Sequence, residues 1–575
     1  MALIRYMLAM LGIMAYTGVS AMPPTATIPG VRVTYHGIHR NGVEVFLNIQ
    51  YGEDTGGNWR FKPPRPHIPA PESTVQADSY GPACPQPLGS LNVPLSLTNI
   101  TSISEDCLNL NIARPQGTKA NALLPVMVYI HGGSFWAGSN SEITTSPDGL
   151  ILESVKNKLP VIHVSMNYRL GIFGFAQTSA LRAEGSENAG LRDQRLAMEW
   201  VRENIAYFGG NPDKVTIFGQ SSGGLAVGAH ILSYGGTKPV PFQRAICQSQ
   251  AMEPGITANY TLDATRAVVD LVGCNKTDLH SAETVSCLRD HDMQAVLGAT
   301  IATYRTDVNI GDIWLPAVDG DYIPDHPSTL IYHKKFAQNL AIMMGWCRDD
   351  LTLFTNTSIS TADDTRHFIT RYLPNLSTDH LHALLSLYPI KDFDANNNLS
   401  REFYRTARIF RDILMTCQPY SFAKYLTINK NSIYFYEWNQ TILDPILEHL
   451  GHPAGMGTVH TSEFAYIFGN LSHYNVSGLP FSPSPSDYEL QVRASRSWST
   501  FASVGKPGLP GRNTFQGFAP AFERQGQVKV FIAGGPNEGI SYIEGPQANP
   551  LFAMEKLRQR CEYWSDIDVV KELKL

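Results

Sequence analysis

Short apolar runs recur along the chain and predict strands that are buried on both faces. Residues 125–130 and 161–165 are continuous runs of this kind, which is typical of strands inside a parallel sheet. Residues 215–218 form another, and they lead directly into a glycine-containing turn. Later segments with the same character are residues 244–248, 341–345, 432–438 and 528–533.

Between two of these runs lies a segment with helical spacing. Leu196, Trp200, Val201 and Ile205 fall on one face of a helix predicted over residues 191–208, and the glycines that follow end it. A second helix is predicted from the turn after residue 218 to Tyr234. Strands that alternate with helices predict an α/β fold, with a mostly parallel twisted sheet and helices on both faces.

The N-terminal part of the chain shows strict alternation of apolar and polar positions instead. Residues 31–36 and 43–49 alternate on either side of Asn41-Gly42, a pair that favours a tight turn, so we expect an N-terminal hairpin. No internal repeat or linker-like change of composition follows. Residues 22–575 are therefore interpreted as a single domain.

The first residues of the chain resemble a targeting segment. Arg5 precedes an apolar stretch over residues 6–16, and Val19-Ser20-Ala21 fits a signal-peptidase site, so residues 1–21 are predicted to be a secretory signal peptide. A membrane anchor is the alternative, but the apolar run is shorter than the roughly 20 residues that a span needs. We expect a secreted protein without stable membrane insertion.

Composition agrees with secretion and excludes one class of partner. The net charge of −6 offers no basic surface for nucleic acid. Eight cysteines are present, and Cys84 with Cys107 and Cys274 with Cys287 lie close enough in sequence to form local disulfides, whereas the other four cannot be paired from sequence. Nine Asn-X-Ser/Thr sequons predict glycosylation at Asn99, Asn259, Asn275, Asn356, Asn375, Asn398, Asn439, Asn470 and Asn475.

A five-residue motif after the strand at 215–218 carries the first chemical signal. Residues 219–223 read Gly-Gln-Ser-Ser-Gly, and such a turn between a strand and a helix holds its central serine, here Ser221, in a strained and exposed conformation. The glycines are needed because side chains there would collide with neighbouring backbone. Ser221 is the candidate nucleophile.

A glycine-rich turn after residue 130 supplies the second signal. His131-Gly132-Gly133-Ser134 can point backbone N–H groups into a site, and such groups stabilise the oxyanion of acyl transfer. The N–H of Ser222, directly after the nucleophile, is expected to be a further donor. Phe135 and Trp136, next in the chain, are expected near the acyl group because they follow this turn.

A serine hydroxyl needs a base, and the base needs an orienting acid. His460 stands out in a glycine-containing loop late in the chain. In hydrolases of this fold the acid lies between the serine and the histidine, and Asp349 and Asp350 follow the strand predicted at 341–345. From these residues alone, either aspartate could serve.

The chain resembles the type-B carboxylesterase/lipase family of α/β-hydrolases, which includes the cholinesterases, and looks like its secreted fungal members. The resemblance covers nearly the whole chain. Its blocks are residues 105–111 (EDCLNLN), 167–174 (NYRLGIFG), 188–194 (NAGLRDQ), 208–212 (FGGNP), 219–223, 345–354 and 457–469.

The resemblance implies roles for particular residues. It implies Ser221, Asp350 and His460 as the triad, with oxyanion donors at Gly133, Ser134 and Ser222 and with Gly132 shaping the turn. It also implies the disulfides Cys84–Cys107 and Cys274–Cys287. Five residues depart from the family pattern. Gln220 stands where Glu is usual, Ser222 where Ala is usual, and Asp350 where Glu is more common. Ser134 replaces the third glycine of its turn, and Leu351 stands in place of a glycine.

These residues predict a secreted serine esterase that acts on a small-molecule ester through an acyl-enzyme and needs no metal or organic cofactor. Three other functions are weighed. A lipase or an acyltransferase would use the same triad, and a non-catalytic cholinesterase-like binding protein would lack part of it. A cholinesterase proper is disfavoured, because the segment between Cys84 and Cys107 contains no tryptophan to bind a quaternary ammonium group.

Overall fold

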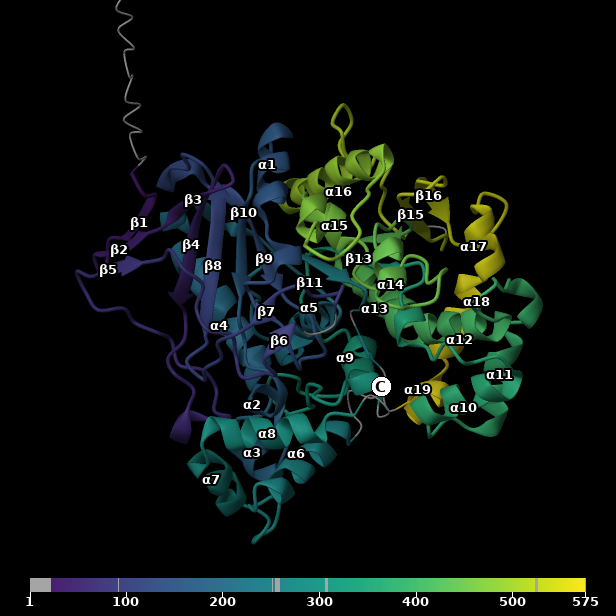
Figure 1. Ribbon diagram of the computed structural model, residues 1–575, viewed down its shortest axis with the longest axis horizontal. Helices are drawn as coiled ribbons and strands as arrows, with labels where there is room; N and C mark the ends of the chain where they lie inside the picture. The colour runs from purple at the N-terminus through teal and green to yellow at the C-terminus, as the bar shows by residue number, and fades with distance from the viewer. Residues whose placement is uncertain are drawn as a thin grey trace, which may run out of the picture.

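An eleven-stranded sheet runs through the computed structural model of the protein (Figure 1). The structure describes residues 22–90, 93–250, 252–253, 259–305, 309–522 and 526–573, so the predicted signal peptide lies outside the described residues. The strand order is β16-β15-β14-β13-β12-β11-β9-β10-β8-β4-β3. The bounds are β3 Ile38–Arg40, β4 Val43–Gln50, β8 Asn109–Pro115, β9 Leu124–Ile130, β10 Ile162–Met166, β11 Gly210–Gln220, β12 Arg244–Gln248, β13 Ala341–Cys347, β14 Ser432–Trp438, β15 Lys529–Ala533 and β16 Gly539–Tyr542.

The seven strands from β10 to β15 in this order pair in parallel, and the strands at both edges pair antiparallel. Each apolar run predicted as a buried strand lies in one of these parallel strands, except that the runs at 161–165 and 528–533 begin one residue before β10 and β15. The α/β prediction is therefore confirmed. Parallel strands place their carboxyl ends at one edge of the sheet, and that edge holds the candidate site.

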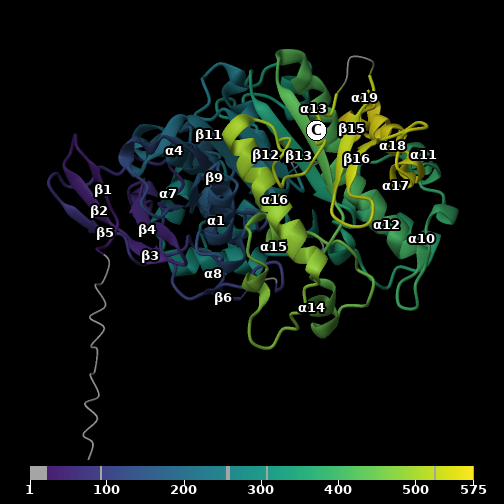
Figure 2. The same cartoon turned by 90° about the horizontal axis from the view of Figure 1, so that it is seen from above.

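Alternate side chains of the central strands pack into different cores. Val126 and Val128 of β9 join a core with Val201 of α4 (Ala189–Asn204), whereas Met127 and Tyr129 join another with Trp498 of α16 (Pro485–Val504). Figure 2 shows α16 along one face of the sheet. Helices thus cover both faces, and the helix predicted over 191–208 is α4 followed by a 3₁₀ turn over Ile205–Phe208.

The N-terminal hairpin forms, but with a different first strand from the one predicted. β3 pairs with β4 across Asn41 and Gly42, which both have positive φ, of 48° and 82°. Residues 31–36 do not pair with β4: β2 (Val33–His36) lies in a separate three-stranded sheet with β1 (Thr25–Ile28) and β5 (Thr74–Gln76). The change of sheet occurs at Gly37, where an added Cβ would lie 2.3 Å from the carbonyl oxygen of Val45.

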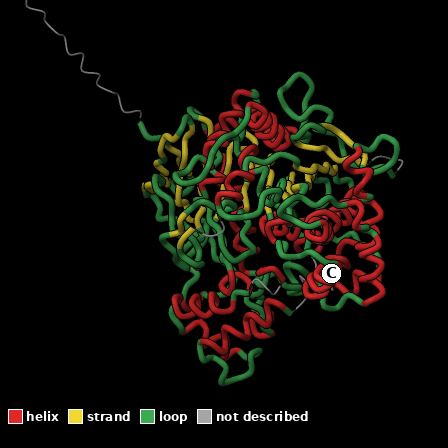
Figure 3. Tube along the Cα trace, turned by 45° about the vertical axis from the view of Figure 1, so that its right-hand side comes forward, coloured by secondary structure: helices red, strands yellow, loops and turns green. Residues whose placement is uncertain are grey.

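Further helices gather in groups away from the sheet (Figure 3), and their apolar side chains extend the core that contains Val126 and Val128. One group holds α6 (Tyr260–Leu271), α7 (Ala282–Asp290) and α8 (Met293–Thr303). Another joins α13 (Cys417–Leu426) to α18 (Leu557–Trp564) near the end of the chain. Within the described residues, no helix combines the length and the apolar character that a membrane span requires.

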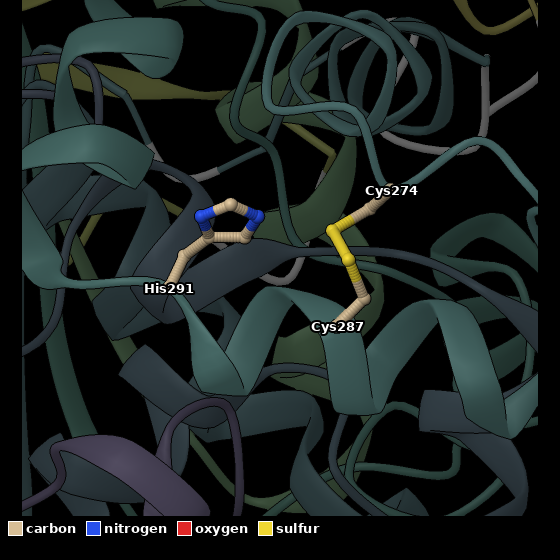
Figure 4. Close-up of side chains that lie close together, drawn as sticks. All are labelled: Cys274, Cys287 and His291. Atoms are coloured by element: carbon tan, nitrogen blue, oxygen red, sulfur yellow. A yellow bond between two sulfur atoms is a disulfide. The ribbon is translucent and has the colours of Figure 1, made fainter.

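Three disulfides connect these parts of the chain. Cys84–Cys107 and Cys274–Cys287 are the pairs that the family resemblance implied, and Cys417–Cys561 joins α13 to α18. Cys247 and Cys347 remain free and buried. Figure 4 shows the imidazole of His291 beside the disulfide Cys274–Cys287. Sulfur atoms in a disulfide carry no thiolate charge, so these three residues do not make a metal site while the bond is intact.

The Cys417–Cys561 disulfide closes a far longer loop than Cys274–Cys287 does. The paired cysteines are 144 residues apart in the first and 13 in the second. Because loop-closure entropy grows with length, replacing Cys417 and Cys561 together by alanine should lower the free energy of unfolding by roughly 5 kcal/mol. The matched change at Cys274 and Cys287 should cost roughly 3 kcal/mol. Denaturant unfolding of both double variants measures the difference, and the reverse order would contradict the expectation.

Candidate active site

Ser221 sits at the tight turn between β11 and α5 (Ser222–Leu232). Its backbone has φ 58° and ψ −131°, a conformation that costs about 1 to 3 kcal/mol and that the surrounding structure must enforce. The turn is held by a hydrogen bond from the Ser221 N–H to the carbonyl of Gln248, at 2.9 Å. An added Cβ at Gly223 would lie 2.2 Å from the carbonyl oxygen of Ile130, so glycine is required there. These contacts give Ser221 the geometry expected from the motif.

His460 and Asp350 meet in the interior of the protein, although 110 residues separate them. Nδ1 of His460 lies 2.5 Å from Oδ1 of Asp350, and the other oxygen of Asp350 accepts a hydrogen bond from the N–H of Cys347 at 2.8 Å. Asp349 has a different partner: its carboxylate accepts a hydrogen bond from the N–H of Thr458 at 3.0 Å. Of the two aspartates left open by the sequence, Asp350 is the one that reaches the imidazole.

The other ring nitrogen of His460 has a partner that the sequence did not predict. Nε2 of His460 lies 3.0 Å from the side-chain amide nitrogen of Gln220, the residue before Ser221. Both side chains are buried, with 3% and 2% of their surface exposed. The sequence singled out Gln220 only as a departure from the family pattern. Nothing in a single sequence predicts the direction of its side chain.

Several carboxyl groups act on the imidazole of His460. Burial on its own would lower the pKa of His460, but the charge and hydrogen bond of Asp350, together with the charges of Glu463 and Asp312, raise it above the ordinary value. Glu463 is itself tied to the Sγ of Cys347 at 3.2 Å and to the amide of Gln248 at 3.2 Å. The electrostatic setting therefore favours a positive charge on His460, as a base that accepts a proton requires.

The glycine-rich turn after β9 lies against the serine turn. An added Cβ at Gly132 would lie 2.4 Å from the carbonyl oxygen of Gln220, so the two turns touch through their backbones. Gly133 and Ser134 both have positive φ, of 107° and 59°. The hydroxyl of Ser222 accepts a hydrogen bond from the N–H of Phe135 at 3.2 Å and so joins the two turns. Backbone N–H groups fixed in this way are suited to an oxyanion.

The hydrogen bond between Ser222 and Phe135 is buried, which makes its loss measurable. Replacing Ser222 by alanine keeps the backbone N–H but leaves the N–H of Phe135 without that acceptor, which should lower the free energy of unfolding by about 1 to 3 kcal/mol. A matched control is Ser495→Ala in α16, because the buried hydroxyl of Ser495 has no hydrogen-bond partner among the described residues. Denaturant unfolding should show a clear loss for the first variant only, and equal losses would contradict the assignment.

A cleft of about 1030 Å³, measured out to its open mouth, leads to these groups. Ser221, His460 and the Gly132–Ser134 turn line its floor, and its walls include Leu95, Ile100, Tyr304, Phe354 and Phe464. Phe135 and Trp136, expected near the acyl group, are not among the described residues that line the cleft. Trp136 lies behind Tyr304, and their rings stack 4.9 Å apart. The spacing along the chain could not show that Tyr304, from the end of α8, would cover the tryptophan.

Glu142 holds one wall of the cleft in place through hydrogen bonds. This residue was not identified from the sequence. Its carboxylate accepts hydrogen bonds from the Ser96 hydroxyl at 2.5 Å and from the N–H groups of Leu97 at 3.0 Å and Thr98 at 3.2 Å. These three residues belong to the segment closed by the Cys84–Cys107 disulfide. One half-buried carboxylate thus holds this segment at the cleft. A lone Glu in a loop gives no sequence signal for such a role.

Comparisons with known proteins agree with this geometry. The model of the carboxylesterase family matches residues 21–529. A secreted lipase of Arthroderma benhamiae is 48% identical over 99% of this chain and 100% of its own. The inactive carboxylesterase-like protein VdtD of Byssochlamys spectabilis is 39% identical, over 83% of each chain. A solved PNB esterase superposes with a TM-score of 0.74 at 26% identity, covering 93% of this chain and 99% of its own. The chain belongs to the carboxylesterase family.

Proposed function

We propose that the protein is a secreted serine hydrolase of carboxylic esters, with Ser221 as nucleophile, His460 as base and Asp350 as orienting acid. The observation that carries this proposal is the 2.5 Å contact between Asp350 and Nδ1 of His460, which leaves Nε2 facing the turn that bears Ser221. The family membership supports the reaction class. The contact supports the assignment of Asp350 over Asp349.

The proposed cycle uses these groups in order. His460 takes the proton of Ser221 as the serine oxygen attacks the ester carbonyl, and the N–H groups of Gly133, Ser134 and Ser222 hold the oxyanion, with Gly132 shaping the turn. The alcohol leaves with the proton from His460, and the acyl group stays on Ser221. Water then repeats the sequence and releases the acid. Asp350 keeps the imidazole in the tautomer that accepts at Nε2 and stabilises the imidazolium.

Secretion and glycosylation are part of the proposal. Three disulfides fit an oxidising compartment, and a relative at 48% identity is a secreted lipase. Residues 1–21 would be removed as the signal peptide and residues 22–575 would form the mature single domain. Two of the predicted glycosylation sites, Asn439 and Asn470, are partly buried, whereas the other seven are exposed. We expect the exposed sequons to be modified more fully than these two.

A lipase is the second candidate, and it is favoured by the secreted lipase relative. The segment between Cys84 and Cys107 lines the cleft through Leu95 and Ile100 and would act as the lid in such an enzyme. Glu142 ties that segment down, which favours access by a soluble ester over opening at a lipid surface. A silent binding protein is disfavoured because Ser221, His460 and Asp350 are all present.

The test uses the secreted full-length protein. A fluorophosphonate probe should label Ser221 covalently, as read by peptide mass spectrometry, and p-nitrophenyl esters from acetate to palmitate should be hydrolysed with a preference for short chains. Emulsified triglyceride turned over faster than soluble esters would favour the lipase. A folded protein that neither takes the probe nor hydrolyses any ester would overturn the proposal.

A further inference from the structure

The hydrogen bond between Gln220 and His460 has a defined donor and a defined acceptor. An amide nitrogen only donates hydrogen bonds, so Nε2 of His460 must accept, and the ring proton is then on Nδ1, where Asp350 accepts it. This is the neutral tautomer in which Nε2 is free to act as a base. The same lone pair must receive the proton of Ser221 when the reaction starts.

Gln220 is held in place for this contact. It is the last residue of β11 and pairs with Gln248 of β12, and its carbonyl oxygen is packed against Gly132. Gln220 and Ser221 both line the cleft. Gln220, next to Ser221 at this strand end, therefore presents a hydrogen-bond donor to the imidazole.

We propose that Gln220 is a positioning residue, whose amide donates to Nε2 of His460 between turnovers and so holds the imidazole neutral and in place until the Ser221 hydroxyl takes over that contact. The inference rests on the proposed function, in which His460 is the base. It assigns a role to a residue that departs from the family pattern.

The surroundings of His460 explain why a neutral donor matters at position 220. The charged groups that act on the imidazole are Asp350 after β13, Glu463 three residues further along its own segment, and Asp312 before Trp314. The Phe354 ring stands nearly perpendicular to it, with ring centroids 5.5 Å apart. All three carboxyl groups favour the imidazolium. A glutamate at position 220 would add a fourth, directly at Nε2. The amide of Gln220 instead stabilises the neutral ring and opposes the rise in the pKa of His460.

Two substitutions separate this role from simple packing. Gln220→Glu places an acceptor and a negative charge at Nε2, and should move the acidic limb of kcat/KM upward by about one to three pH units. Gln220→Met has similar length but no hydrogen bond, so the limb should move upward by less. Gln527→Glu makes the same chemical change at an exposed residue before β15 and should leave both the limb and the activity unchanged.

A second measurement does not depend on turnover. Histidine labelled with ¹⁵N reports the titration of His460 by NMR, and the His460→Gln variant identifies its resonance. The pKa of His460 should rise in the order wild type, Gln220→Met, Gln220→Glu. If the variants lose activity while neither the limb nor the titration moves, Gln220 is only a packing residue and the inference is wrong. If instead the titration follows this order but Ser221 takes no probe and no ester is hydrolysed, the proposed function fails and the hydrogen-bonding role of Gln220 stands.

Discussion

Replacing Ser221 by alanine is expected to lower kcat for p-nitrophenyl butyrate by roughly 10⁴ to 10⁶-fold. Alanine removes the oxygen that we propose as the nucleophile, while the turn keeps its backbone contact to Gln248 and its glycines. Initial rates across a range of ester concentrations measure the loss. KM should change little, because the cleft walls that bind the substrate are untouched.

The matched control for this variant lies at the other end of α5. Ser233 is also buried, and its hydroxyl donates to the carbonyl of His230, away from the cleft. Ser233→Ala should keep most of the activity. Retention of wild-type turnover by Ser221→Ala, in protein free of contaminating esterase, would rule out the assigned nucleophile.

Replacing Asp350 by asparagine should lower kcat by about 10⁴-fold. The shape of the side chain is preserved, but an amide facing Nδ1 of His460 can favour the tautomer with the proton on Nε2, which cannot act as a base. The charge of Asp350 also raises the pKa of His460, so its loss should move the acidic limb of the residual activity to lower pH. Steady-state kinetics between pH 5 and 9 record both effects; this range is about that in which an imidazole titrates.

Asp349→Asn is the natural comparison, because the two aspartates are neighbours and the sequence alone did not separate them. An asparagine oxygen can still accept the hydrogen bond from the Thr458 N–H, and the ion contact with Arg408 that would be lost is long, at 3.7 Å. We expect a far smaller loss of kcat and no shift of the acidic limb. A larger effect at Asp349 than at Asp350 would reverse the assignment of the acid.

The sheet was predictable from the sequence because its strands are buried on both faces. Such strands must be apolar throughout, and residues 432–438 and 244–248 were identified to the residue as β14 and β12. The serine turn was also predictable, because an added Cβ at Gly219 or Gly223 would lie 2.5 Å or 2.2 Å from backbone atoms, so both positions require glycine. Local physical constraints of this kind restrict the residue types at neighbouring positions, so they can be recognised in the sequence.

Contacts between segments that are distant in sequence produce no such local pattern. The Cys417–Cys561 pairing spans 144 residues, and four cysteines could not be paired from their spacing. The hydrogen bonds of Glu142 to residues 96–98 and of Gln220 to His460 depend on side-chain directions that only the folded chain fixes. The first strand of the hairpin was misplaced for a related reason, because Val33–His36 alternates as any strand does and the break at Gly37 depends on the packing of Val45.

The strand order of the sheet has a consequence for biosynthesis. From β11 onward the strands β12, β13, β14 and β15 are added one beside the next in the order in which a ribosome makes them. The turn with Ser221 can therefore form early, yet His460 follows Gln220 by 240 residues. No nascent chain shorter than 460 residues can contain the whole of the proposed triad. An ester-cleaving enzyme built in this order stays inert inside the producing cell until its synthesis is nearly finished.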